Sequence, residues 1–210
     1  MSGRRISLAM LVAILFMSAV AFSDQPPTVP GWFIAGATPE KYQASVDSSV
    51  VHSGSSSASL AAITDAEGFE YGTLMQFIDA RPHIDKRLRF SVFIRTAGVK
   101  IGAAAWMRID GDDGRVLAFD NMSDRGWFRE DQSWSRADIV LDVLPESKVI
   151  SFGVLLKGNG MVWIDTASLE PVFRHIATTG TPVTGPRLPV APDELPPSPV
   201  NLGLEATAEM

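Results

Sequence analysis

Apolar and polar residues alternate along the central part of the chain with a period of two. In the run 87–95 the even positions are apolar and most odd positions are polar, and the runs 101–110, 136–143 and 150–157 follow the same pattern. Successive side chains of a β-strand point to opposite faces, so this period predicts strands that bury one face. Outside residues 1–23, no stretch of the sequence shows the 3.6-residue period of an amphipathic helix.

Turn-forming residues separate these runs. Breakers at 97–98, 111–114 and 144–146 interrupt the pattern, and Lys-Gly-Asn-Gly at 157–160 predicts a hairpin turn before a further strand at 162–165. About eight strands at regular spacing, polar on alternate faces, are typical of sandwiches and jelly rolls. The predicted fold is therefore all-β, an antiparallel jelly-roll β-sandwich.

Residues 1–23 predict an N-terminal signal peptide. Two arginines at positions 4 and 5 precede an apolar run over 8–22, and small residues at 19, 21 and 23 give two small-x-small cleavage positions. The alternative is an uncleaved anchor helix, although the run is short for a membrane span, which needs about 20 apolar residues. We expect an exported protein, periplasmic or extracellular, that contacts a membrane only through an uncleaved signal.

The other end of the chain also differs from the middle. Residues 174–210 contain seven of the 14 prolines and none of the 18 aromatic residues, so they cannot bury a core of their own. We expect residues 24–173 to form the folded unit and residues 174–200 to form a Pro-rich linker. A final segment, 201–210, follows the linker.

Charge and cysteine content exclude several classes of function. The chain has no cysteine, which excludes disulfides, thiolate zinc sites and cysteine nucleophiles. Its formal net charge is −6, and loss of the two arginines with the signal peptide lowers it to −8 because residues 1–23 contain no acid. Phosphate contacts need clustered positive charge, so we expect no nucleic-acid partner.

The sequence offers little for catalysis. Its three histidines are far apart, and GxSxG, Walker and GxGxxG motifs are absent from it. We therefore expect a protein that is not an enzyme, with a hydrolase as the least favoured alternative. The acidic run at 110–114 is predicted to be a hairpin turn, the alternative being an oxygen-rich calcium loop.

One set of residues suits recognition of a saccharide. Trp106 and Arg108 lie two positions apart on a predicted strand and so project from one face. Asp120, Asn121 and Arg125 follow in a compact segment, and such side chains hydrogen-bond hydroxyl groups while an aromatic ring packs on a sugar ring. The alternative is structural: Trp106 is partly buried, Arg108 pairs with Asp120, and the set holds the sheet together. On another strand, Arg89, Phe93 and Arg95 are expected to share a corresponding face.

Short motifs over residues 30–172 point to a family. They are GWFIAG at 31–36, PEKY at 39–42, HSG opening 52–60, GF at 68–69, GTLMQ at 72–76, AWMRIDG at 105–111, LAFDNM at 117–122, Trp134, VLDV at 140–143, FGVLL at 152–156 and WID at 163–165. Together they resemble bacterial exported domains with a galactose-binding-like, carbohydrate-module jelly roll, a family that is largely uncharacterised.

The resemblance implies a binding module for a saccharide or a cell-envelope component. It also allows a structural calcium, for which Asp165 is a candidate ligand, and it implies no other cofactor. Members usually have a second Asp after this position, whereas here Thr166 follows, and the sequence shows no partner ligand. The alternative role of Asp165 is hydrogen bonding to a neighbouring loop.

Such modules usually open with a strand resembling Asn-Leu-x-Phe-Glu, and this chain has a Pro-rich segment in that place. Residues 201–205, Asn-Leu-Gly-Leu-Glu, have a similar pattern at the far end of the chain. We hypothesise that this segment folds back, or crosses to another copy to form a homo-oligomer, and completes the sheet. The alternative is a disordered tail end.

Two functions follow as expectations. The first is an exported, non-catalytic binding module for a saccharide or envelope component. The alternative is a structural or protein-interaction domain whose tail mediates assembly with a protein partner.

Overall fold

The computed structural model describes residues 21–23, 28–180 and 194–205. Most of the described chain is strand, and its elements in chain order are β1 (Ala21–Phe22), β2 (Phe33–Gly36), η1 (Pro39–Lys41), β3 (Tyr42–Asp47), β4 (Ser57–Ala62), β5 (Tyr71–Asp79), η2 (Arg81–His83), β6 (Arg87–Gly111), β7 (Val116–Asp120), β8 (Phe128–Asp142), β9 (Ser147–Lys157) and β10 (Met161–Val172). In these three ranges the helices are two 3₁₀ turns, and none is long or apolar enough to cross a membrane. Residues 1–20 of the predicted signal peptide, which was predicted over 1–23, lie outside the described residues.

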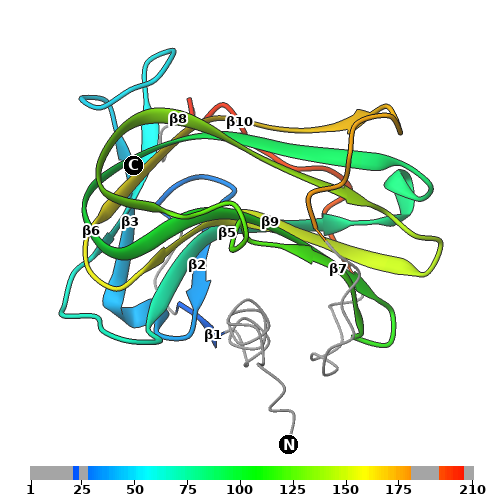
Figure 1. The fold of residues 1–210 in the computed structure, drawn as a ribbon, viewed down its shortest axis with the longest axis horizontal. Helices are drawn as coiled ribbons and strands as arrows, with labels where there is room; N and C mark the ends of the chain where they lie inside the picture. The colour runs from blue at the N-terminus through cyan, green and yellow to red at the C-terminus, as the bar shows by residue number, and fades with distance from the viewer. Residues whose placement is uncertain (1–20, 24–27, 181–193, 206–210) are drawn as a thin grey trace, which may run out of the picture.

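The strands form one antiparallel sheet that curls into two layers (Figure 1). Its order is β1-β2-β5-β9-β6-β10-β4-β3, with β7 and β8 also paired to β6. Strand β6 is 25 residues long and belongs to both layers, since residues 87–97 pair with β10 whereas residues 102–111 pair with β9. Strand β8 pairs with β6 between residues 87 and 103, and β7 pairs with it between residues 107 and 110. We call β8, the first part of β6, β10, β4 and β3 the upper layer, and the remaining strands the lower layer. The prediction of an all-β antiparallel fold is confirmed.

The core lies between the two layers. Phe90 on β6 in the upper layer and Phe152 on β9 in the lower layer are both fully buried, with ring centroids 5.0 Å apart. Trp32 belongs to the same core and meets Phe152 edge-on at 6.1 Å. Burial of each such ring contributes about 2–3 kcal/mol, so this aromatic contact is a main source of cohesion between the layers.

These contacts define which face of each strand is inside. Phe152 points inward and pairs with Met107, so Met107 is also inward, while its neighbours Trp106 and Arg108 point to the outer side of the lower layer. In the upper layer Phe90 points inward, so Phe93, three positions along, points outward.

The turn at 157–160 differs from its prediction. Strands β9 and β10 are not paired with each other, because β6 lies between them in the sheet order. The turn instead passes over β6, where the backbone N–H of Lys100 donates to the carbonyl oxygen of Asn159 at 3.0 Å. Gly158 and Gly160 have φ of 72° and 127°, so the Gly-rich sequence supplies a crossing between layers, and the hairpin prediction is wrong.

Residues 194–205, which we call the C-terminal strap, fold back onto the sandwich. Leu204 is 1% exposed and belongs to the core, and the Trp32 indole donates to the carbonyl oxygen of Asn201. Residues 201–205 form a turn and irregular backbone, because Asn201 and Leu204 have φ of 47° and 58° and so leave the extended region. The segment therefore does not form the strand that the sequence suggested, and residues 206–210 lie outside the described residues.

Candidate functional site

The structure buries the aromatic residue of the predicted site. Trp106 is 4% exposed, and its indole Nε1 donates to the Thr73 hydroxyl at 2.7 Å. Arg108 pairs with Asp110, with 3.0 Å between its Nε and the Asp110 Oδ2, and not with Asp120. Burial raises the pKa of the Asp110 carboxyl, and the Arg108 guanidinium opposes that effect. In this structure the Trp106 ring offers no open face to a ligand.

The other three predicted residues close a loop. Asp120 receives hydrogen bonds from Arg125 at 2.7 Å and from the backbone N–H of Met122 at 2.8 Å. Asn121 is 2% exposed, and its backbone carbonyl accepts the Trp127 indole at 2.8 Å. These bonds fix the segment that leads from β7 into β8.

The five predicted residues therefore do not form one surface. Met107 pairs with Asp120 and Arg108 pairs with Phe119, so Asp120 shares the inward face with Met107. Trp106 and Arg108 project from the opposite face of the same sheet. The structure brings Asp120, Asn121 and Arg125 together, and it separates them from Trp106 and Arg108.

Asp165 is fully buried and serves as an anchor for a loop. Its Oδ2 accepts the backbone N–H groups of His52 at 2.8 Å and Ser53 at 3.1 Å, and its Oδ1 accepts that of Thr166. N–H groups that point at a carboxylate occupy the positions a cation would need. Across the described ranges, no group of three or more His, Cys, Asp or Glu side chains could hold a metal ion. The acidic run at 110–114 forms the turn between β6 and β7.

Because Asp165 holds this loop, a histidine is placed over the upper layer. The His52 ring is exposed and stacks on Phe93, with centroids 3.7 Å apart and planes 18° apart. It also meets the Trp134 ring edge-on at 5.6 Å, and its Nδ1 lies 3.3 Å from the Thr166 hydroxyl. The loop that carries His52, strand β6 and strand β8 thus contribute one ring each to a single cluster.

A second tryptophan lies beside this cluster. Trp163 on β10 pairs with Arg95 on β6, and the Arg95 guanidinium carbon lies 6.0 Å from the centroid of the Trp163 ring. The Trp163 indole donates to Asp47 at 2.8 Å, which fixes the ring. We call His52, Phe93, Trp134 and Trp163 the aromatic platform.

The pKa of Asp47 reflects how firmly this carboxylate is held. Burial alone would raise it, but hydrogen bonds from Ser49, the Trp163 indole and the backbone of Val50 outweigh burial and lower the pKa to about 2. The carboxylate that orients Trp163 is therefore ionised at every physiological pH.

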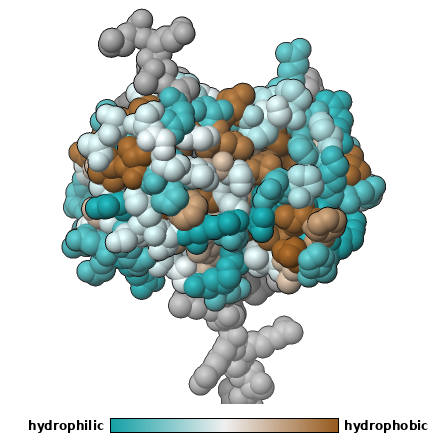
Figure 2. All heavy atoms as spheres, turned by 90° about the horizontal axis from the view of Figure 1, so that it is seen from above, coloured by the Kyte–Doolittle hydropathy of each residue, from teal (hydrophilic) through white to brown (hydrophobic). Residues whose placement is uncertain are grey.

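Polar side chains on the outer side of the upper layer extend the platform. Arg136 donates to Asp138 and to the Ser91 hydroxyl, and Arg89 is paired with Glu170. Figure 2 shows the molecule from this side, over β8 and β10, with separate hydrophobic patches among hydrophilic and intermediate residues. The face is therefore a mixed surface that combines rings with charged groups.

Part of this platform was visible in the sequence. The alternation in 87–95 placed Phe93 and Arg95 on one face, and Trp134 and Trp163 both occur among the short motifs over residues 30–172. The sequence could not predict that these four rings lie close together. Strands β6, β8 and β10 become neighbours only in the folded sheet, and His52 lies on a loop that Asp165 holds. The signal was a set of aromatic residues in otherwise polar, outward positions.

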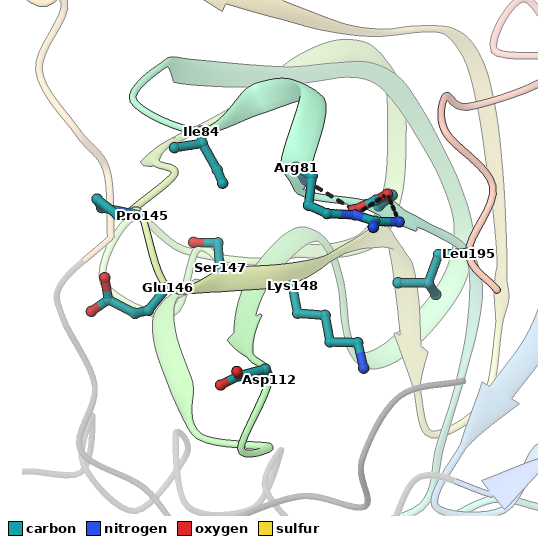
Figure 3. Close-up of a pocket in the computed structure, with 9 residues that line it drawn as sticks. Arg81, Ile84, Asp112, Pro145, Glu146, Ser147, Lys148 and Leu195 are labelled. Atoms are coloured by element: carbon teal, nitrogen blue, oxygen red, sulfur yellow. Dashed lines mark hydrogen bonds and ion pairs between the residues drawn. The ribbon is translucent and has the colours of Figure 1, made fainter. Parts of the chain in front are cut away.

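A separate cleft of about 370 Å³ lies at the far end of β5. Figure 3 shows Ile84, Pro145 and Glu146 on one side of it, and Lys148 with Leu195 of the strap on the other. Other lining residues are Asp79, Arg81, Asp112 and Ser147. Arg81 is paired with Asp79 at 2.6 Å, and its hydrogen bond to Asp79 lowers the pKa of that carboxyl, so neither charge is free.

No known protein-family profile matches the chain. A protein of Bacillus subtilis (strain 168), named uncharacterized HTH-type transcriptional regulator YbfP, is 39% identical over 190 residues. The match covers 90% of this chain and 61% of that protein, so the chain spans about three fifths of the length of this relative.

Solved structures are similar at low sequence identity. The enzymatically active domain of tailspike protein 4 from bacteriophage CBA120 has a TM-score of 0.52 at 12% identity, over 69% of this chain and 20% of that one. The CBM22-1 xylan-binding domain of Paenibacillus barcinonensis Xyn10C has a TM-score of 0.49 at 14% identity, over 73% of this chain and 96% of that one. The first likeness shows a shared fold, and neither carries an inference about the ligand.

Proposed function

We propose that this chain is an exported, non-catalytic saccharide-binding module, and that the aromatic platform is its binding surface. The observation that supports this most is the juxtaposition of His52, Trp134 and Trp163 on the outer side of one layer. Two strands and a loop, far apart in sequence, supply rings to the same face.

The chemistry of the platform suits a sugar. Aromatic rings pack against the C–H faces of pyranose rings, and charged side chains beside them hydrogen-bond the hydroxyls. Arg95 borders Trp163 and forms no ion pair with any described acid, so its N–H groups can donate to a hydroxyl or carboxylate oxygen of the ligand. The platform thus combines apolar contact with directional polar contact.

The platform is also held in place before a ligand arrives. Asp47 fixes the Trp163 indole, and Asp165 fixes the loop that carries His52. A surface whose side chains are already ordered loses less conformational entropy on binding. This preorganisation supports recognition of a rigid, repetitive ligand such as a polysaccharide.

The non-catalytic part of the proposal rests on the state of the carboxylates near the platform. Asp47, Asp138 and Asp165 are all engaged in hydrogen bonds with donors of the protein. General acid–base chemistry needs a carboxyl group free to exchange a proton with the substrate. Export is proposed on the apolar, arginine-preceded segment at 1–23.

A binding experiment tests the proposal. Wild-type protein is applied to an array of neutral, uronic-acid and amino-sugar glycans, and the best binder is titrated by calorimetry. We expect saturable binding that Trp134→Ala weakens by about tenfold or more, equal to about 1.4 kcal/mol or more. Trp127→Phe, which alters a tryptophan away from the platform, should bind as wild type does. Absence of saturable binding to every glycan, or unchanged binding by Trp134→Ala, would refute the proposal.

A further inference from the structure

The C-terminal strap lies in a groove whose contacts have the character of a peptide-binding site. We propose that this groove also accepts the strap of a second copy of this chain, so that two chains exchange straps and form a dimer. The partner is thus another copy of the same protein, and the interaction surface is the groove lined by residues around Trp32, Ser55 and Gln76.

Side chains of the sandwich hold the backbone of the strap. The Gln76 amide makes two bonds to Val200, since its Nε2 donates to the carbonyl oxygen at 2.7 Å and its Oε1 accepts the backbone N–H at 3.0 Å. Trp32 donates its indole N–H to the Asn201 carbonyl, and the Asn201 amide donates back to Pro30. Recognition of main-chain groups by a preformed groove is how extended peptides are bound by many domains.

The strap also fills pockets with its side chains. Leu204 is 1% exposed, and its carbonyl oxygen accepts the Ser56 hydroxyl at 2.7 Å. The carboxylate of Glu205 accepts both the backbone N–H and the hydroxyl of Ser55, and these hydrogen bonds lower its pKa. An apolar anchor and a charged anchor therefore lie next to each other at the end of the strap.

The groove is shaped for a closely approaching chain. A Cβ atom added to Gly31 would lie 2.2 Å from Val200, and one added to Gly54 would lie 1.6 Å from the Glu205 carboxylate. Both glycines have positive φ, 79° and 72°. Bare backbone at these two positions lets the strap approach closely, and this applies equally to a strap from another copy.

The connection to the strap favours exchange. Thr179 is fixed to β8 through three hydrogen bonds with Val140, and the next segment, 181–193, contains prolines at 182, 186, 189 and 192. A segment of 13 residues can reach about 43–47 Å at most, which is long enough to reach a neighbouring molecule. Exchange of an identical element keeps every contact of the strap, so the remaining free-energy cost is that of bringing two molecules together. If the proposed function holds, the dimer also presents two aromatic platforms to one polysaccharide.

Two differently tagged samples of the full chain test this inference. They are mixed at high concentration, and mixed dimers are captured through one tag and detected through the other, with mass measured by light scattering. We expect mixed dimers that dissociate to monomers in excess synthetic peptide of residues 194–210. The same peptide carrying Leu204→Asp should leave the dimers intact.

A strap variant keeps the test decisive. The full chain carrying Leu204→Asp should be monomeric and should bind the wild-type peptide in trans, with circular dichroism as the check on folding; Leu204→Ala replaces it if the first variant does not fold. A wild-type chain that stays monomeric at every concentration, or dimers that persist in excess wild-type peptide, would overturn strap exchange. None of these readouts depends on a glycan, so failure here is distinguishable from failure of the proposed function.

Discussion

The indole Nε1 of Trp32 donates a hydrogen bond to the backbone carbonyl of Asn201 at 3.0 Å, across 169 positions of sequence. Trp32 is 1% exposed and packs edge-on against Phe152 in the core. The two ends of the described chain are therefore joined at the same buried ring, and the strap forms part of the sandwich.

The first prediction concerns this bond. Trp32→Phe keeps most of the ring but removes the donor, which leaves the Asn201 carbonyl without this partner. We expect a loss of about 1–2 kcal/mol in the free energy of unfolding, measured by urea denaturation. Trp134→Phe serves as the matched control on the platform, and it should change stability by less than about 0.5 kcal/mol. Equal stability of the Trp32 variant and wild type would show that the strap is not bound through this ring.

The second prediction concerns the apolar anchor of the strap. Leu204→Ala removes a side chain that is 1% exposed and leaves a cavity, so we expect a cost of about 2–4 kcal/mol. Leu144→Ala changes the same residue type at a position that is 38% exposed and should be nearly neutral. Thermal unfolding of the three proteins makes the comparison. Similar melting temperatures for both variants would contradict burial of the strap.

The third prediction concerns the loop that carries His52. Asp165→Asn weakens the bonds from the His52 and Ser53 amides, and hydrogen bonds to a charged group contribute about 1.5–3 kcal/mol. We expect faster hydrogen exchange at both amides and weaker glycan binding. Asp124→Asn, an exposed position, is the control. Unchanged exchange at both amides would show that another contact holds the loop.

The fourth prediction concerns pH. The pKa of Asp47 falls from its ordinary 3.8 to about 2 in the folded protein. A carboxyl whose folded pKa is lowered adds stability that is fully present above the unfolded value and disappears as pH falls through the folded value. Wild type should therefore be more stable than Asp47→Asn at neutral pH, and the difference should shrink between pH 4 and pH 2. A difference in melting temperature that is constant over this range would contradict the assignment.

Much of the fold could be predicted from the alternation of apolar and polar residues alone. The errors of that prediction have a physical origin. The runs 87–95 and 101–110 are parts of a single strand, β6, because Gly98 adopts φ of 60° at a point where the register with β8 shifts, without ending the strand. Alternation also identified Trp106 and Arg108 as neighbours on one face. It could not tell which face is covered, since burial depends on elements distant in sequence.

The candidate site shows the same limit more strongly. The sequence pattern around a tryptophan in a strand does not show whether the ring is buried, as that of Trp106 is, or half-exposed, as that of Trp134 is. The strap could be anticipated from its Asn-Leu-x-Leu-Glu pattern. Its turn conformation could not, because the positive φ at Asn201 and Leu204 depends on the groove that holds them.

The five tryptophans of the chain provide the most direct test of the proposed binding surface. Each indole N–H gives its own nuclear magnetic resonance signal, which single Trp→Phe variants assign. The glycan selected on the array is titrated into the labelled protein. Binding on the platform predicts shifts of the Trp134 and Trp163 signals, with those of Trp32 and Trp106 unmoved. A shift at Trp106 while Trp134 and Trp163 stay in place would contradict the account.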